Sequence, residues 1–296
     1  MYVITGATGN TGKVIAETLL AKGKKVKVVG RTMERLKPLV IQGAEPFLGS
    51  LDDVSLMTDA FTGAKTVYTM IPPNYMAENL RAYQNKVGET LVEAVARAGV
   101  QYVVNLSSVG AHLSDGIGPI KGLHDMEQRL NTLSGVHIVH LRPFFFMENM
   151  FFNISLIKTA GVNGSPLKPD IAIPMVATRD IASVASSLLL RLDFLGKSVK
   201  ELLGERDISM GEATRILGQA IEKEELPYVQ FSYEAAQKAM LEMGFSKSVA
   251  EAFIEMYHGM NEGVVKPTEK RSTENTTPTR FEEFSLQFKS VYKNQA

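Results

Sequence analysis

Hydrophobic and polar positions follow two different periods along the first half of the chain. Short apolar runs typical of strands occur at residues 2–4, 25–30, 44–49, 66–71, 101–106 and 136–141. Between most of them lie longer segments with helical spacing, such as residues 11–23 and 78–99. Strands and helices in alternation predict right-handed crossovers and a parallel sheet covered on both faces. The pattern therefore predicts an α/β fold with a doubly wound, Rossmann-type sheet.

The pattern changes after about residue 145. Residues 172–190 predict a strand and then an apolar helix with Asp180 as its N-cap. We expect this unit, roughly residues 172–192, to pack back onto the first domain. The chain thus divides into a sheet domain over residues 1–150 and a smaller, mostly helical lobe over residues 151–296.

The smaller lobe carries several helix signals. Ser209 and Glu212 form a candidate capping box, and residues 232–244 and 246–263 predict helices that end at glycine. Residues 266–284 are polar and contain two prolines. We expect this tail to wrap the surface before a last short helix.

Composition narrows the class of partner. The 296 residues are 45% hydrophobic and 22% charged, which is ordinary for a soluble globular protein, and 32 basic residues balance 32 acidic ones. This balance favours a small-molecule or protein partner over nucleic acid or a membrane surface. The chain has no cysteine, no secretory signal before the first strand, and no apolar stretch long enough to span a bilayer. We expect a cytoplasmic monomer or homodimer.

A glycine-rich loop follows the first strand. Gly6, Gly9 and Gly12 are separated by small polar residues, and a helix begins near Thr11. Free backbone N–H groups and the positive end of a helix at one point bind a pyrophosphate. In such a loop the first glycine permits the tight turn, the second admits the ligand, and the third lets the helix pack close to the strand. The spacing, G-x-x-G-x-x-G, departs from the standard fingerprint, but its place between strand and helix predicts dinucleotide binding.

The end of the second strand bears on the choice of nicotinamide cofactor. Gly30 stands where an NAD enzyme usually carries a carboxylate, and Arg31 follows it. An arginine at this place accommodates the 2′-phosphate of NADP. We therefore expect NADP(H) to be preferred, with NAD(H) possible. The alternative is that Arg31 is a solvated loop residue.

Five motifs together resemble the NmrA-like branch of the atypical short-chain dehydrogenase/reductase superfamily. They are "TGATGNTG" at residues 5–12, "VVGR" at 28–31, "NLSSVGAH" at 105–112, "GVHIVHLRPFFFMEN" at 135–149 and "VATRDIASV" at 176–184. The resemblance covers about residues 1–215. It implies a Rossmann domain, a helical lobe and a cleft between them. Members of the family include NAD(P)H-dependent quinone and dye reductases and non-catalytic sensors of the nicotinamide redox state.

The resemblance also assigns cofactor contacts. The loop residues would contact the pyrophosphate, Arg31 the 2′-phosphate, Ser50 and Leu51 the adenine, and Ile71 and Pro72 the ribose on the nicotinamide side. The loop residues concerned are Gly6, Thr8, Gly9, Asn10, Thr11 and Gly12.

The usual proton donor of the superfamily is missing. Its typical members pair a serine after the fifth strand, here Ser107 or Ser108, with a Tyr-x-x-x-Lys on the next helix. In this chain His124 stands at the lysine position and Ile120 at the tyrosine position. This argues against a general carbonyl reductase or an epimerase, because an alkoxide product needs an acid.

Two hypotheses remain. The chain transfers hydride from NADPH to a quinone-like or other conjugated small molecule, with help from His124 or the serines, or it is a non-catalytic NADP(H) sensor. For the substrate, the resemblance places Phe145, Phe146, Met147 and Asn149 along the cleft, with core packing as the alternative.

The histidines add little. His112, after the fifth strand, is a further cleft candidate. The five histidines show no zinc-binding spacing, so no metal is expected, and His137 and His140 on a strand should be structural.

Overall fold

The central sheet of the computed structural model, which describes residues 1–295, has seven parallel strands in the order β3-β2-β1-β4-β5-β6-β10. The strands are Tyr2–Ile4 (β1), Val26–Gly30 (β2), Glu45–Leu48 (β3), Thr66–Thr69 (β4), Tyr102–Leu106 (β5), His137–Pro143 (β6) and Lys197–Leu202 (β10). The first six coincide with the predicted apolar runs. The predicted α/β fold with a doubly wound Rossmann-type sheet is therefore confirmed.

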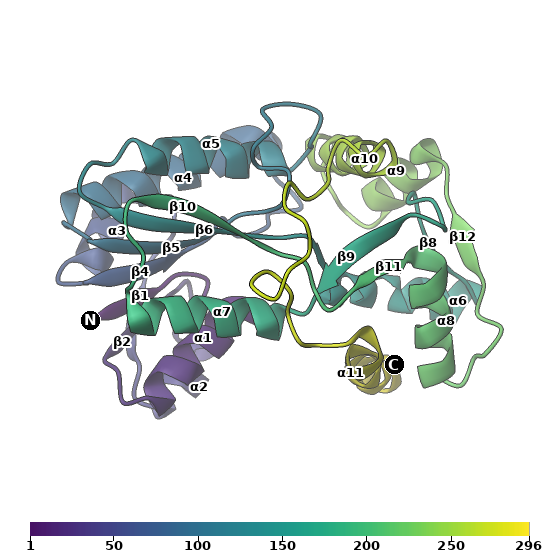
Figure 1. Ribbon diagram of the computed structural model, residues 1–296, viewed down its shortest axis with the longest axis horizontal. Helices are drawn as coiled ribbons and strands as arrows, with labels where there is room; N and C mark the ends of the chain where they lie inside the picture. The colour runs from purple at the N-terminus through teal and green to yellow at the C-terminus, as the bar shows by residue number, and fades with distance from the viewer. Residues whose placement is uncertain (296) are drawn as a thin grey trace.

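Both faces of this sheet are buried. Residues adjacent in a strand point to opposite faces, so Val3 and Val103 join one core while Ile4 and Val104 join another. The first face is covered by α3 (Val54–Phe61), α4 (Leu80–Arg97) and α5 (Ile120–Asn131). The second is covered by α1 (Asn10–Ala21), α2 (Met33–Ile41) and α7 (Thr178–Arg191), below the sheet in Figure 1. Double burial explains why the strands read as continuous apolar runs.

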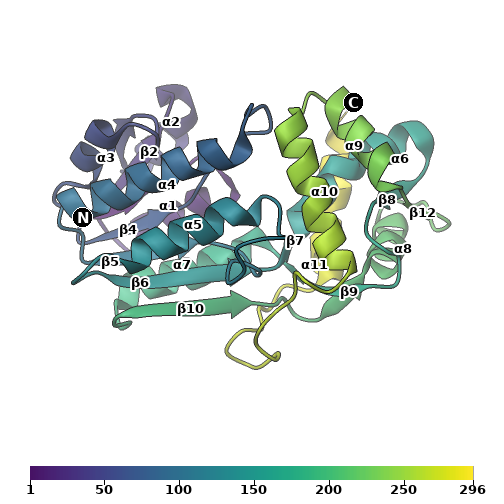
Figure 2. The same cartoon turned by 90° about the horizontal axis from the view of Figure 1, so that it is seen from above.

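The second lobe is mostly helical and lies at the carboxyl ends of the strands (Figure 2). Its strands are β7 (Phe145–Phe146), β8 (Asn163–Ser165), β9 (Ala172–Val176), β11 (Asp207–Ser209) and β12 (Tyr228–Gln230), arranged as β11-β9-β7 and β12-β8. Its helices are the 3-10 helix η1 (Met147–Asn153), α6 (Ile154–Ala160), α8 (Met210–Ala220), α9 (Tyr233–Glu242), α10 (Lys247–Asn261) and α11 (Phe281–Asn294).

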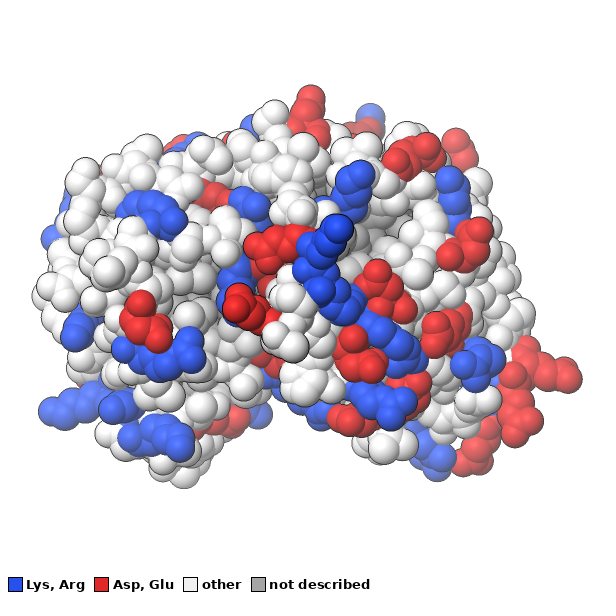
Figure 3. Space-filling model, viewed as in Figure 1, with Lys and Arg blue, Asp and Glu red and all other residues white. Residues whose placement is uncertain are grey.

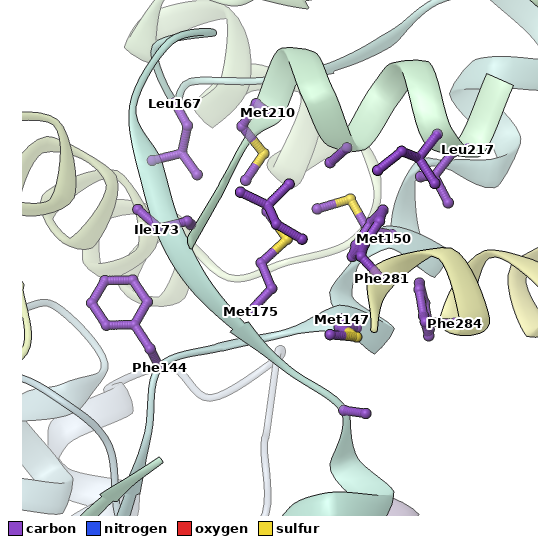
Figure 4. Close-up of a cluster of buried hydrophobic side chains, with 14 of the residues drawn as sticks. Phe144, Met147, Met150, Leu167, Ile173, Met175, Met210, Leu217, Phe281 and Phe284 are labelled. Atoms are coloured by element: carbon purple, nitrogen blue, oxygen red, sulfur yellow. The ribbon is translucent and has the colours of Figure 1, made fainter. Parts of the chain in front are cut away.

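A separate hydrophobic core holds the second lobe together (Figure 4). Phe281, Phe284 and Phe288 lie on one face of α11 and are fully buried. Met147 and Met150 of η1 belong to the same cluster. The last helix, predicted as a short terminal element, is thus a main component of this core.

Residues 172–192 are shared between the two lobes. The helix α7 packs against the sheet lobe, whereas β9 pairs with β7 and β11 in the second lobe. The strand β10 then returns to the central sheet beside β6. Its Lys197, Ser198 and Lys200 give it no apolar signal, and the pattern did not predict it.

The predicted N-cap of α7 is wrong. Ala177 occupies the cap, and Asp180 lies inside the first turn, where it is buried. Its carboxylate accepts hydrogen bonds from the backbone N–H of Thr279 at 2.9 Å and the Thr279 hydroxyl at 2.7 Å. Asp180 therefore fastens the tail to α7 instead of capping the helix. The predicted cap Ser209 does accept from the N–H of Glu212, at 3.1 Å.

The polar tail is more buried than expected. It runs between the two lobes before α11 (Figure 1). Asn275, Thr277 and Thr279 are buried, and the buried carboxylate of Glu201 accepts hydrogen bonds from Thr268. Polar side chains can be buried here because most of them find hydrogen-bonding partners.

Charged side chains of both signs occur on each lobe of the face seen in Figure 3. Within residues 1–295, none of the helices has the length and apolar character that a membrane crossing requires.

Candidate active site between the lobes

The glycine loop has the geometry that dinucleotide binding requires. Gly6 has a φ of +61°, which favours glycine, and a Cβ at Gly12 would overlap the carbonyl oxygen of Gly6. Gly9 is the N-cap of α1 and offers no side chain to the first N–H groups of the helix. These N–H groups have no partner inside the helix and are available to an anion.

A cavity of about 730 Å³ opens from this loop. The first lobe contributes the glycine loop, the segments after β4 and β5, and the start of α5. The second lobe contributes most of residues 144–152 and one face of α10. A volume of this size accommodates a small organic ligand.

Six of the predicted cofactor residues line the cavity, namely Gly6, Gly9, Asn10, Thr11, Ile71 and Pro72. Thr8 and Gly12 belong to the same loop but do not line it. Thr11 also shares a hydrogen bond of 2.9 Å with the buried phenol of Tyr68, which orients its hydroxyl. Burial raises the pKa of Tyr68, so this phenol stays protonated.

The predicted adenosine contacts Arg31, Ser50 and Leu51 do not line the cavity. The N–H of Gly49 donates to the carbonyl of Gly30 at 3.0 Å, which brings Ser50 and Leu51 close to Arg31. A Cβ at Gly30 would lie 2.8 Å from Leu36, so the position of the missing carboxylate is already crowded.

The Arg31 side chain is exposed. Within residues 1–295 it forms no ion pair or hydrogen bond with another side chain. It lies near Tyr83. Burial raises the pKa of Tyr83, and the positive charge of Arg31 partly opposes this rise. Tyr83 in turn donates to the carbonyl of Pro72 at 3.1 Å, which links this region to the cavity.

Ser107 is held in a buried network. Its hydroxyl donates to the carboxylate of Glu127 at 2.5 Å, and Glu127 forms a bidentate ion pair with Arg142. Glu127 is 1% exposed. Ser107 also lines the cavity. Its hydroxyl hydrogen is engaged by Glu127, and its catalytic role stays a prediction. Ser108 lines the cavity and donates to the carbonyl of Val109 at 3.0 Å.

The two histidine predictions are not supported by position. On α5 it is Ile120 and Leu123 that line the cavity, whereas His124 does not, and its Nδ1 lies 2.9 Å from the carbonyl oxygen of Ala111. His112 is exposed and also lies outside the cavity lining. His124 therefore ties α5 to the loop after β5.

The predicted substrate residues divide into two groups. Phe145, Phe146 and Asn149 line the cavity. Met147 is 1% exposed and belongs to the core of the second lobe, so its prediction as a cleft residue is wrong. A residue in the first turn of η1 turns away from the cavity because successive side chains of a helix point in different directions.

An aromatic group at the other end of the cavity was not predicted. The ring of Tyr75 stacks on Phe245 with centroids 4.7 Å apart and meets Phe152 edge to face at 5.9 Å. Phe253 lies 6.4 Å from Tyr75, and Tyr75, Phe152 and Phe253 all line the cavity. The available signal was the apolar stripe Val249, Phe253, Met256 and Met260, which has helical spacing but does not show which surface it meets.

Glu148 is the second feature that sequence reasoning missed. Glu148 lines the cavity. Its carboxylate accepts hydrogen bonds from the N–H of Thr178, at 3.0 Å to each oxygen, and from the Thr178 hydroxyl at 2.6 Å. Burial raises its pKa, and the Thr178 hydrogen bonds partly oppose this. Glu148 therefore binds the N-terminus of α7.

The chain resembles known proteins along most of its length. The model of the NmrA-like family matches residues 2–285. The chain belongs to the NmrA-like family. The family resemblance predicted from the five motifs is thus confirmed. An NAD(P)H azoreductase from Xenophilus azovorans is 25% identical over 257 residues, which cover 87% of this chain and 86% of the relative.

Solved structures share the fold over nearly the whole chain. An NADPH-dependent quinone oxidoreductase from Escherichia coli, complexed with NADPH, has a TM-score of 0.82 and 20% identity, covering 97% of this chain and 99% of its own. A triphenylmethane reductase from Citrobacter sp., complexed with NADP(H), has a TM-score of 0.79 and 19% identity, covering 98% and 100%. Both lobes therefore occur together in proteins of this kind.

Proposed function

We propose that the chain is an NADPH-dependent oxidoreductase that transfers hydride to a quinone-like or other conjugated small molecule. The observation that carries the proposal is that the glycine loop and a set of aromatic side chains line one cavity of about 730 Å³. These side chains, which we call the aromatic wall, are Tyr75, Phe145, Phe146, Phe152 and Phe253. The cofactors and acceptors named for the azoreductase, quinone oxidoreductase and triphenylmethane reductase support the same class of reaction.

The described residues suit NADPH. The N–H groups at the start of α1 would hold the pyrophosphate, and Arg31 would meet the 2′-phosphate. Ile71 and Pro72 line the cavity next to the glycine loop, where the nicotinamide half would lie. When bound, the cofactor supplies the hydride.

A conjugated acceptor removes the need for a strong acid in the site. A quinone, one proton and one hydride give a hydroquinone, and the anion formed first is delocalised over the ring. Such an anion is a weaker base than the alkoxide of a simple ketone, so a weak acid or water can protonate it. This agrees with Ile120 at the tyrosine position and with Ser107 bound to Glu127.

The protein then contributes orientation. Phe145, Phe146 and the group of Tyr75, Phe152 and Phe253 line the cavity with aromatic side chains. Aromatic faces hold a planar acceptor by offset or edge-to-face contact. Keeping two rings in contact lowers the entropy cost of their reaction.

The test follows the loss of NADPH absorbance with quinones, dyes and simple aliphatic ketones. We expect turnover of conjugated acceptors, none of the ketones, and retained activity in His124→Ala. Phe253→Ala should lower kcat/KM by about tenfold, because it removes one face of the wall. Tight NADPH binding without turnover of any acceptor would contradict the proposal and identify the chain as a sensor.

A further inference from the structure

The charged side chains that line the cavity are of one sign, negative. Among residues 1–295, Glu148 is the one acidic side chain of the lining, and no lysine, arginine or histidine lines it. The remaining lining residues are apolar, aromatic or neutral polar. The phosphates of a bound dinucleotide are also negative and do not compensate Glu148.

The Glu148 carboxylate is bound as an acceptor. Each of its hydrogen bonds comes from Thr178, the first residue of α7. The N-terminus of a helix carries partial positive charge and stabilises a carboxylate. The backbone N–H of Thr178, 3.0 Å from both carboxylate oxygens, can only donate and therefore favours the ionised carboxylate.

Nearby basic side chains are engaged elsewhere. Arg179 follows Thr178, but its guanidinium donates to the Thr279 hydroxyl at 2.8 Å and to Glu283 at 2.9 Å. Lys121 on α5 pairs with Asp115 and Glu255, each at 2.7 Å. Neither lies in the cavity lining, so Glu148 is not neutralised from inside the cavity.

We propose that this cavity selects acceptors by charge, taking neutral and cationic conjugated molecules and rejecting anionic ones, with Glu148 as the specificity-determining residue. The inference deepens the proposed reductase function and rests on it. An anion entering the cavity would lose water and gain no cationic partner, and it would meet a like charge. A cation would gain both the carboxylate and the aromatic faces of Tyr75, Phe152 and Phe253.

The experiment uses three aminoazobenzene dyes with one skeleton, which carry a trimethylammonium group, no charged group or a sulfonate. The value of kcat/KM with NADPH is measured for each dye in the wild type and in Glu148→Gln. For each protein, kcat/KM of the cationic dye is divided by kcat/KM of the anionic dye. Comparing this quotient between the two proteins cancels the intrinsic reactivities of the dyes. We expect the quotient to be about tenfold or more lower in the Gln variant than in the wild type.

Two further variants provide a control and an independent test. Glu78→Gln removes an exposed acid from the loop that carries Tyr75, outside the cavity lining, and should leave the quotient unchanged. Met256→Lys adds a cation to the part of the lining that α10 contributes, leaves Glu148 and Thr178 unchanged, and should improve use of the sulfonated dye by about tenfold. The second variant keeps the test decisive if Glu148→Gln does not fold.

Binding separates this proposal from the reductase proposal. Dissociation constants of the three dyes are measured with the protein loaded with 1,4,5,6-tetrahydro-NADP, whose nicotinamide ring is neutral like that of NADPH and donates no hydride. Charge-ordered binding without any turnover would overturn the reductase function and support the selectivity. Equal quotients in the wild type and all variants would overturn the selectivity alone. An equal loss of kcat with all three dyes in Glu148→Gln, at unchanged binding, would also overturn it, since Glu148 would then act as a proton donor.

Discussion

Arg142 at the end of β6 and Glu127 on α5 form a buried ion pair in which two guanidinium nitrogens meet the two carboxylate oxygens, Nε to Oε1 at 2.9 Å. The pair joins the sheet to the helix that borders the cavity. Because Glu127 also accepts from Ser107, the pair fixes the position of the segment after β5.

Replacing Arg142 by methionine should destabilise the protein strongly. The variant leaves Glu127 buried without its partner, and breaking a buried pair costs about 3–5 kcal/mol. Urea unfolding followed by circular dichroism gives the free energy. Arg97→Ala, which breaks the exposed pair with Glu93, is the matched control and should cost less than about 1 kcal/mol. Equal losses in the two variants would contradict the structural role.

Arg31→Ala should distinguish the two nicotinamide cofactors. Losing a charge-assisted contact to the 2′-phosphate costs about 1.5–3 kcal/mol, which is roughly a tenfold to hundredfold weaker affinity for NADPH. Affinity for NADH should hardly change, because it lacks that phosphate. Titration calorimetry with both nucleotides measures this, with Arg97→Ala as the control at the far end of α4. An equal loss for both would remove the phosphate assignment.

Gly12→Ala should impair the loop itself. The added Cβ meets the backbone of Gly6, which cannot give way as a flexible side chain would, so α1 must shift. We expect at least about a tenfold loss of NADPH affinity, together with lower stability. Gly88→Ala in α4 is the control, since its Cβ would lie no closer than 3.5 Å to Met126. That variant should retain binding and gain up to about 1 kcal/mol from helix propensity.

His140 predicts a pH dependence of stability. It is buried between Asn105 and Asn131, at 3.1 Å from each, and burial lowers its pKa to about 4 from the usual 6.5. The unfolded chain therefore binds a proton that the folded chain refuses, and stability falls as the pH drops from about 6.5 to about 4.

The full effect of this histidine is about 3 kcal/mol. The measurement compares the free energy of unfolding of the wild type with that of His140→Gln across this window. Carboxylates titrate in both proteins, so the difference between them isolates the histidine. Parallel curves would rule out a neutral His140 in the folded state.

The fold was predictable because its signals are local. All of the first six strands appear as apolar runs, and five of them are buried on both faces, the exception being the edge strand β3. The glycine loop needs specific residues at specific places. The strand β10 gave no such signal, because much of it is exposed at the edge of the sheet.

The site was only partly predictable because its aromatic wall is assembled from segments that are far apart in the sequence. Tyr75 and Phe253 meet across 178 positions of sequence, and nothing local shows that they share a cavity. Ser107 looked free until Glu127, twenty residues later, was placed against it. Glu148 was passed over because its contact, Thr178, lies thirty residues away.

Separate hydrophobic cores underlie the two ends of the cavity. Core residues on either side of the sheet support the glycine loop, and Met150 and Phe281 belong to the core on which Phe145 packs. A further small cluster around Leu80 and Val249 supports Tyr75 and Phe253. Laboratory evolution aimed at new acceptors can therefore randomise residues of the aromatic wall while the core residues that support the glycine loop stay unchanged. The division makes the scaffold modular.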